Sequence, residues 1–127
     1  MASYCPRMSS ILVIDDDAGV REMLEQTLTA AGYQVTTASN GKQASSLYHS
    51  HPPTLVITDI YMPDRDGLEV IMELHQDFPG TKIIAISGQV NRNMLPVSLA
   101  LGALRTLCKP FEPEELLRAV AEVLPPA

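Results

Sequence analysis

Residues 11–17 have the sequence ILVIDDD, in which four branched apolar side chains are followed by three acids. A continuous apolar run of this length is typical of a β-strand buried on both faces. Similar short runs recur at residues 35–38, 55–58, 82–86 and 104–108, and a helix-length segment follows each one. The first of these segments repeats its apolar residues with helical spacing, at Val20, Met23, Leu24 and Leu28. The pattern predicts a (βα)5 alternation.

Strands that alternate with helices form a parallel sheet covered on both faces, with right-handed crossovers. The runs at 11–14, 55–58 and 82–86 are almost entirely apolar, whereas those at 34–37 and 104–107 carry polar residues. The polar runs are therefore expected at the two edges of the sheet. A doubly wound, flavodoxin-like α/β fold with strand order 2-1-3-4-5 satisfies this placement, although the residues themselves argue only for the edges.

Turn and cap residues separate the expected elements: Gly32, Asn40-Gly41, Pro52-Pro53, Asp66-Gly67 and Pro96. Gly32 and the proline pair are expected to end helices, and the others to lie at helix starts. We expect an N-terminal tail at 1–10, one domain at 11–124 and a C-terminal tail or linker stub at 125–127.

The composition limits the classes of function. The 127 residues are enough for one domain with a substantial core, and the 46% hydrophobic content indicates a folded protein. A net charge of −6 disfavours nonspecific binding to nucleic acid, which depends on neutralising phosphates. Cys5 and Cys108 do not indicate a disulfide framework or a zinc site. No run has the length of a signal or membrane span, so a cytoplasmic location is expected.

Polar residues follow four of the expected strands: Asp15-Asp16-Asp17, Asp59, Ser87 and Lys109-Pro110. The carboxyl ends of parallel strands meet at one rim, where ligands bind in such folds. Each residue alone has an ordinary explanation, and Asp17 is expected to cap the following helix. Carboxylates gathered in one place repel one another, however, unless a divalent cation lies among them.

Mg²⁺ suits this set of oxygen ligands. Zinc is disfavoured because the three histidines, His49, His51 and His75, fall near helix ends away from the rim. A calcium-binding EF-hand at residues 15–26 is excluded, since its sixth position is Val20 rather than glycine and its twelfth is Gln26 rather than glutamate. A magnesium site is therefore expected at the rim.

A carboxylate, Mg²⁺, a lysine and a hydroxyl are the components of phosphoryl transfer. Asp59 would attack phosphorus as a nucleophile, and the product would be an aspartyl phosphate. Lys109 would contribute a positive charge, and Ser87 would donate a hydrogen bond.

Four ordered motifs resemble the receiver domains of two-component response regulators over about residues 11–124. They are IDDD at 14–17, DIYMP at 59–63 with DG at 66–67, ISG at 86–88, and KPF at 109–111. The resemblance implies a phosphorylation-controlled switch that catalyses its own phosphorylation and slow hydrolysis.

The same resemblance assigns a role to each site residue. Asp59 matches the phosphoacceptor. Asp15 and Asp16 match the acidic pair that holds Mg²⁺, one directly and one through water, with the backbone carbonyl of Tyr61 as a further ligand. Ser87 matches the switch hydroxyl, and Lys109 matches the lysine that pairs with the phosphoryl group. The Lys109–Pro110 bond is typically cis in the family.

The implied partners also come from the resemblance. The phosphoryl donor would be a sensor histidine kinase, a histidine phosphotransfer protein or a small acyl phosphate. The fourth helix, fifth strand and fifth helix would contact a downstream protein or a C-terminal output domain, and they could support a dimer.

Two positions depart from the family pattern. Thr106 stands three residues before the lysine, where an aromatic residue usually completes the switch, and a β-branched side chain cannot sweep the same volume. Tyr61 stands two residues after Asp59, where smaller polar residues are common. Its ring either shields the phosphoryl group from water or lies exposed at a partner surface.

Two other functions compete with the phosphorylated switch. One is a receiver-like interaction module that is not phosphorylated, against which the intact acids and lysine weigh. The other is a small phosphoaspartate-type hydrolase, which needs a second acid where Tyr61 stands.

Overall fold

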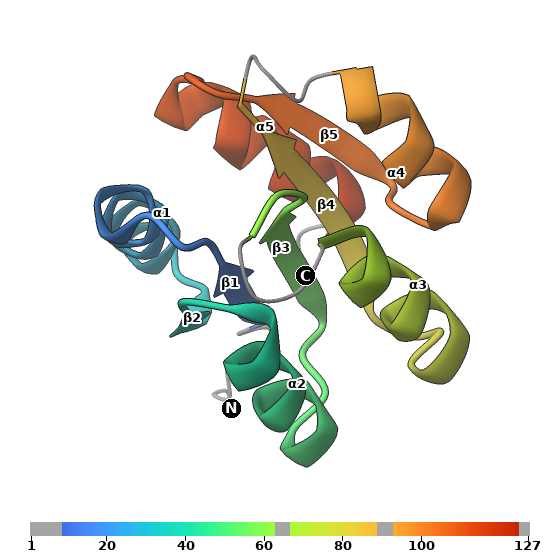
Figure 1. Cartoon of the computed structure of the whole chain (residues 1–127). Coiled ribbons are helices and arrows are strands. Elements are labelled where there is room, and N and C mark those ends of the chain that lie inside the picture. Colours follow the sequence, from blue (N-terminus) through green and yellow to red (C-terminus); the bar gives the residue numbers. More distant parts are fainter. Residues whose placement is uncertain (1–8, 63–66, 89–92, 125–127) are drawn as a thin grey trace.

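The structure is a computed structural model that describes residues 9–62, 67–88 and 93–124. Five parallel strands form one sheet in the order β2-β1-β3-β4-β5 (Figure 1). Their bounds are Ser10–Ile14 for β1, Gln34–Ala38 for β2, Leu55–Asp59 for β3, Lys82–Ser87 for β4 and Arg105–Cys108 for β5. The predicted strand order and both predicted edge strands are confirmed.

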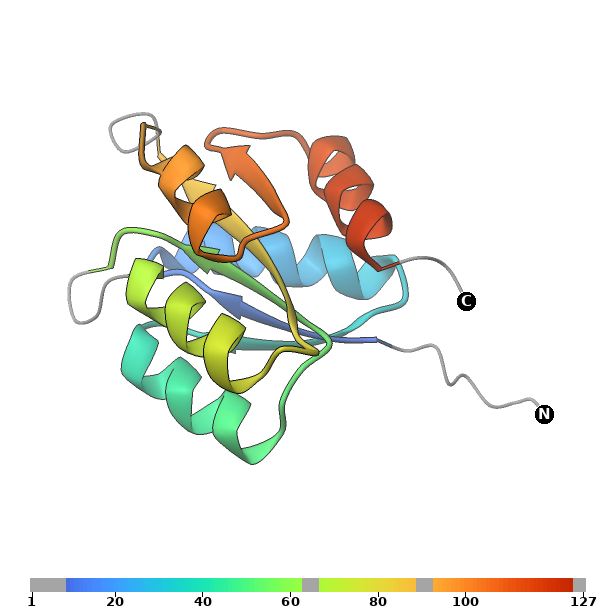
Figure 2. The ribbon, with the colours of Figure 1, turned by 90° about the vertical axis from the view of Figure 1, so that its right-hand side faces the viewer.

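Five helices cover the sheet, at Ala18–Ala30 (α1), Gly41–Ser50 (α2), Gly67–Asp77 (α3), Leu95–Leu101 (α4) and Pro113–Val123 (α5). Helices α1 and α5 lie on one face, and α2, α3 and α4 lie on the other, as the two views in Figures 1 and 2 show. Among the described residues, no helix is long and apolar enough to cross a membrane.

The apolar runs that predicted the strands supply the core on both faces of the sheet. In β1, Ile11 and Val13 pack with α1 and α5, whereas Leu12 and Ile14 pack with α2 and α3. Alternate side chains of a strand point to opposite faces, so a strand covered on both sides must be apolar throughout. The exposed fractions of these four residues are 2% or less.

The predicted helix ends are confirmed where the structure describes them. Asp17 Oδ1 accepts hydrogen bonds from the N–H groups of Gly19 and Val20, and Asn40 caps α2 in the same way. Gly32 follows α1 with a φ of +101°, which favours glycine. Pro96 lies in the first turn of α4.

Some expected features lie outside the described residues. They are Pro63 and Asp66 in the second motif, part of the loop before α4, and the two chain ends. The predicted domain boundaries therefore stay predictions.

Candidate functional site

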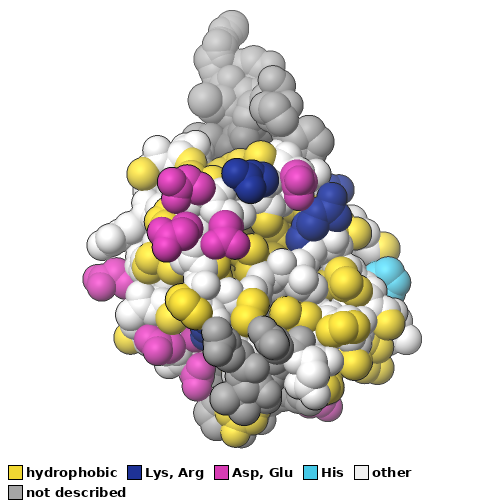
Figure 3. Space-filling view, turned by 90° about the horizontal axis from the view of Figure 1, so that it is seen from above, with side chains coloured by type: hydrophobic (Ala, Val, Ile, Leu, Met, Phe, Trp, Pro, Cys, Tyr) yellow, Lys and Arg dark blue, Asp and Glu magenta, His cyan; other side chains and the backbone are white. Residues whose placement is uncertain are grey.

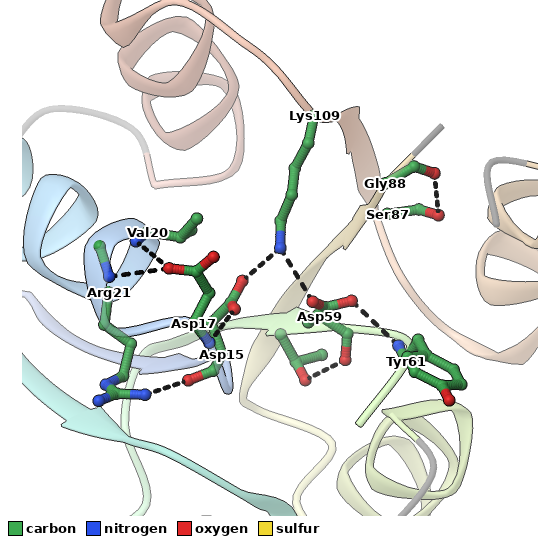
Figure 4. Close-up of polar contacts among 11 residues, drawn as sticks. Asp15, Asp17, Val20, Arg21, Asp59, Tyr61, Ser87, Gly88 and Lys109 are labelled. Atoms are coloured by element: carbon green, nitrogen blue, oxygen red, sulfur yellow. Dashed lines mark hydrogen bonds and ion pairs between the residues drawn. The ribbon is translucent and has the colours of Figure 1, made fainter. Parts of the chain in front are cut away.

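The carboxyl ends of β1, β3 and β5 bring the predicted acids and lysine together (Figure 4). One carboxylate oxygen from each of Asp15, Asp16 and Asp59 lies within 4.8 Å of the others. Asp15 and Asp59 are buried, whereas Asp16 is exposed. The sheet register explains this convergence, because β1 and β3 are paired neighbours that end at the same rim.

Lys109 reaches from the end of β5 to both buried acids. Its Nζ donates a hydrogen bond to Asp59 Oδ2 at 3.0 Å and forms an ion pair with Asp15 Oδ2 at 2.9 Å. The contact with Asp15 lacks the angles of a hydrogen bond, so Asp15 Oδ2 is a buried oxygen with no hydrogen-bond donor. Such an oxygen is available to a cation.

Burial and charge act on the protonation of this site in opposite directions. Burial raises the pKa of Asp15 above its usual value of 3.8, and the contacts with Lys109 and the Asp17 N–H only partly offset it. Burial alone would lower the pKa of Lys109, but its close contacts with the negative charges of Asp15 and Asp59 outweigh burial and raise that pKa. Lys109 is therefore positively charged at neutral pH.

Backbone groups hold the second oxygen of each buried acid. The Asp17 N–H donates to Asp15 Oδ1 at 2.9 Å, and the Tyr61 N–H donates to Asp59 Oδ1 at 3.0 Å. Arg21 Nη1 also donates to the Asp15 carbonyl oxygen at 2.7 Å, which ties α1 to the end of β1. These contacts fix both carboxylates with their Oδ2 atoms toward Lys109.

Gly67 supports the site in a way that the sequence analysis missed. A Cβ atom at this position would lie 2.1 Å from the Asp59 carbonyl oxygen and 2.6 Å from Ile60 Cα. The start of α3 therefore packs directly on the backbone that carries Asp59. The sequence offered only the weaker signal that Asp66-Gly67 opens a helix.

The predicted switch residues lie in β4 and β5, and the hydrogen bond of Ser87 is separate from the contacts of the acids. Ser87 is buried at the end of β4, and its hydroxyl donates to the Gly88 carbonyl oxygen at 2.9 Å. Figure 4 shows this pair apart from the contacts of Lys109. Thr106 is half-buried in β5 opposite Ala85 of β4.

Tyr61 is 64% exposed, and its ring extends away from the Asp59 carboxylate (Figure 4). Of the two predicted alternatives, this conformation corresponds to the exposed ring. The role of its backbone carbonyl as an ion ligand stays a prediction.

The three histidines lie at or just after the C-terminal ends of their helices, away from the acidic rim, as expected. His49 and His75 are in the last turns of α2 and α3, and His51 follows α2. The predicted cis peptide bond at Lys109–Pro110 is confirmed.

Figure 3 shows how side-chain types are distributed over one face. Most of the visible acidic side chains lie in its left half, and apolar side chains are uncovered across its middle and right. The exposed apolar residues include Val97 and Leu99 of α4, at 40% and 47%, and Leu104 before β5, at 45%.

Comparisons with known proteins agree with this geometry. A family model described as "Response regulator receiver domain" matches residues 11–121. The "Probable transcriptional regulator ycf27" of Porphyra purpurea is 40% identical over 116 residues, which cover 90% of this chain and 46% of that protein. The chain thus spans about half the length of the first curated relatives that it matches.

Two shorter proteins match over nearly their whole length. The chemotaxis protein CheY of Thermotoga maritima is 35% identical over 114 residues, which cover 89% of this chain and 95% of that protein. The crystal structure of a CheY-like receiver domain protein from Methanospirillum hungatei has a TM-score of 0.87 and 30% identity, covering 92% of this chain and 94% of that one.

Proposed function

Because the chain belongs to the response regulator receiver family of two-component systems, we propose that Asp59 is its phosphoacceptor. The observation that supports this proposal best is the placement of Lys109 Nζ at 2.9 and 3.0 Å from Asp15 and Asp59. A half-buried ammonium between two buried carboxylates is suited to a third anionic group that enters the rim.

The transfer forms one bond and breaks one. A carboxylate oxygen of Asp59 attacks phosphorus, and the bond from phosphorus to the donor's nitrogen or acyl oxygen breaks, leaving its electron pair on the donor. The Tyr61 N–H keeps Asp59 Oδ1 in place during the attack, and Lys109 faces Oδ2. Lys109 then pairs with an oxygen of the bound phosphoryl group, where it offsets the added negative charge.

Receiver domains typically bind Mg²⁺ through acidic residues, and the cluster of Asp15, Asp16 and Asp59 fits such an ion. The buried Asp15 Oδ2, with no hydrogen-bond donor, is the observation that supports the fit. We assign these three carboxylates and the Tyr61 carbonyl as its ligands. The ion would neutralise phosphoryl oxygens as they approach the acids.

The switch is assigned to Ser87 and Thr106. The Ser87 hydroxyl would leave the Gly88 carbonyl oxygen and donate to the phosphoryl group, which gives phosphorylation a differential contact between two conformations. Thr106 has less volume than the usual aromatic residue, so its movement would change the surface less.

The direct test is to incubate the protein with acetyl phosphate and Mg²⁺ and to measure the intact mass. We expect the addition of one phosphoryl group, which Asp59→Asn abolishes. Asp17→Asn is the matched control, because Asp17 caps α1 and contributes no oxygen to the acidic cluster. A protein that gains no phosphoryl group, or an Asp59→Asn variant that still gains one, would contradict the proposal.

A second test concerns Tyr61 and the lifetime of the phosphoryl group. If the ring turns over the aspartyl phosphate and shields it from water, Tyr61→Ala will lose the group faster than wild type. An unchanged rate of dephosphorylation would remove this role and leave Tyr61 as an exposed residue at the partner surface.

The proposed phosphoryl donors are a sensor histidine kinase or a histidine phosphotransfer protein. The proposed output surface is formed by α4, β5 and α5, which would contact a downstream protein, an attached output domain or a second copy. The exposed Val97 and Leu99 support this assignment, because exposed apolar side chains favour protein contacts.

A further inference from the structure

The two edges of the sheet differ in charge and pairing. At the β5 edge, Arg105 is paired with Glu122 of α5 at 2.9 Å. At the β2 edge, residues 31–41 carry no charged side chain. Figure 1 shows β2 at the end of the sheet, between α1 and α2, and no helix or strand of the described residues lies beyond it. Edge strands are commonly protected by charge, proline or a cover; β2 contains no charged residue or proline, and no helix or strand within the described part of the chain covers its edge.

The hydrogen bonds to β1 show which groups of β2 face outward. The Gln34 N–H donates to the Ser9 carbonyl oxygen at 3.1 Å, and the Ala38 carbonyl oxygen accepts from the Asp15 N–H at 3.2 Å. Backbone groups of alternate residues point to the same side of a strand. Val35 and Thr37 therefore direct their N–H and C=O groups to the open edge.

One face of β2 is also uncovered. Gln34 and Thr36 are exposed on the side of α2, where a hollow of about 390 Å³ lies between β2 and the end of α2. Leu12 and Leu47 line the hollow together with Pro52 and Pro53, so α2 does not close over this part of the strand. A second strand could approach the edge from this side.

We propose that the β2 edge pairs with the β2 edge of a second copy of this chain, antiparallel about a twofold axis at Thr36. Val35 then faces the partner's Thr37, and Thr37 faces the partner's Val35. Each facing pair exchanges two hydrogen bonds, and Thr36 meets the partner's Thr36 in a pair without hydrogen bonds. The two five-stranded sheets become one continuous sheet.

The absence of charged side chains in β2 favours a second copy of this chain as the binding partner. A twofold axis brings each residue near its own copy, so any charged side chain close to the axis would repel itself. The chain has a net charge of −6, yet its charged residues stop at Glu25 and resume at Lys42 on the two sides of β2. In this antiparallel pairing, the outward N–H and C=O groups of Val35 meet those of the partner's Thr37. The two strands need no shift in register to form these hydrogen bonds.

A cross-linking experiment tests the register. In a background of Cys5→Ser and Cys108→Ser, Thr36→Cys places two thiols opposite each other across the axis, within the reach of a disulfide. Gln34→Cys is the matched control, exposed on the same face of the same strand. In the proposed register, Gln34 of one copy and Gln34 of the second copy are four residue positions apart along the strands, which is about 13 Å. We expect oxidation to give a dimer at least tenfold faster for Thr36→Cys, and equal rates would overturn the register.

Sedimentation of the wild-type chain tests the association itself. We expect the mass to rise with concentration from 13.8 kDa toward twice that value. Thr37→Pro removes an outward N–H that β1 does not use, so it should keep the fold and return the protein to a monomer. Leu99→Asp on α4 should leave the dimer intact. The proposal is overturned by a wild-type monomer at several hundred micromolar, or by a dimer that Leu99→Asp separates and Thr37→Pro does not.

Discussion

Ile14 and Asp15 are consecutive residues with the same exposed fraction, 0%, but they belong to regions with opposite energetics. Ile14 ends the apolar part of β1 and packs in the cluster under α2 and α3. Asp15 begins the polar rim and faces Lys109 and Asp59. Burial stabilises an apolar side chain and destabilises a charged one unless the charge is compensated. Burial of the apolar strand residues therefore stabilises the fold, whereas burial of the charged rim residues destabilises it.

The compensation at the rim is incomplete. Lys109 neutralises part of the charge and backbone N–H groups hold the Oδ1 atoms, yet the pKa of Asp15 remains raised. Such perturbed groups are typical of sites that are shaped for a ligand. Substitutions in the two regions should therefore change stability in opposite directions.

The largest effect is expected in the strands. Ile57 of β3 is fully buried between α1 and α5, so Ile57→Ala should lower the free energy of unfolding by about 4 kcal/mol. Urea denaturation measures this loss, and the folded fraction should still accept a phosphoryl group from acetyl phosphate. A loss below about 1 kcal/mol would show that the core does not depend on close packing at this position.

Gly67→Ala should affect both regions at once. Because its Cβ would overlap the Asp59 carbonyl oxygen, α3 or the end of β3 must move, which should cost about 2 to 3 kcal/mol and slow phosphorylation. Gly80→Ala is the control, since no atom lies within 4 Å of its Cβ. Thermal denaturation and the rate of phosphorylation should change for the first variant and stay near wild type for the second.

Asp15→Asn should increase the free energy of unfolding, in contrast to the two substitutions above. The amide keeps the shape of the carboxylate and removes a buried charge, so the metal-free protein should gain about 1 kcal/mol of stability while phosphorylation is lost. Asp17→Asn, at an exposed cap, should leave stability near wild type because asparagine caps helices equally well. A destabilised Asp15→Asn variant would mean that the pairing with Lys109 outweighs the cost of burial.

The pH dependence sharpens this prediction. A group whose pKa is higher in the folded state binds its proton more tightly there, so protonated Asp15 favours folding. This contribution is complete below the unfolded value of 3.8 and is lost as the pH rises through the raised native value. The stability advantage of Asp15→Asn should therefore grow from about pH 4 upward and then level off. Urea titrations of wild type and Asp15→Asn at several pH values, with a chelator present, measure this difference in the free energy of unfolding. A difference that stays constant with pH would show that the charge of Asp15 does not affect stability.

The sequence carries the information for the strands better than for the rim. The apolar runs identified β1, β3 and β4 as central, because burial on both faces leaves a direct mark on composition. The convergence of Asp15, Asp59 and Lys109 also followed, since strand ends share a rim. The contacts of Gly67 and Arg21 did not follow, because they depend on how helices pack against particular strand ends.

The smallest effect on stability is expected for Arg105 of β5. Its ion pair can be compared with that of Lys109, the residue that follows β5. Arg105 and Lys109 both lie 2.9 Å from a carboxylate, but the side chains of Arg105 and Glu122 are each 49% exposed, whereas that of Asp15 is 0% exposed. Water and salt screen an exposed pair, so Arg105→Gln should cost no more than about 0.5 kcal/mol. In 1 M NaCl the Debye length is about 3 Å, and the difference should disappear. A cost that persists at high salt would instead point to packing of the Arg105 stem, since the aliphatic part of arginine also covers apolar surface.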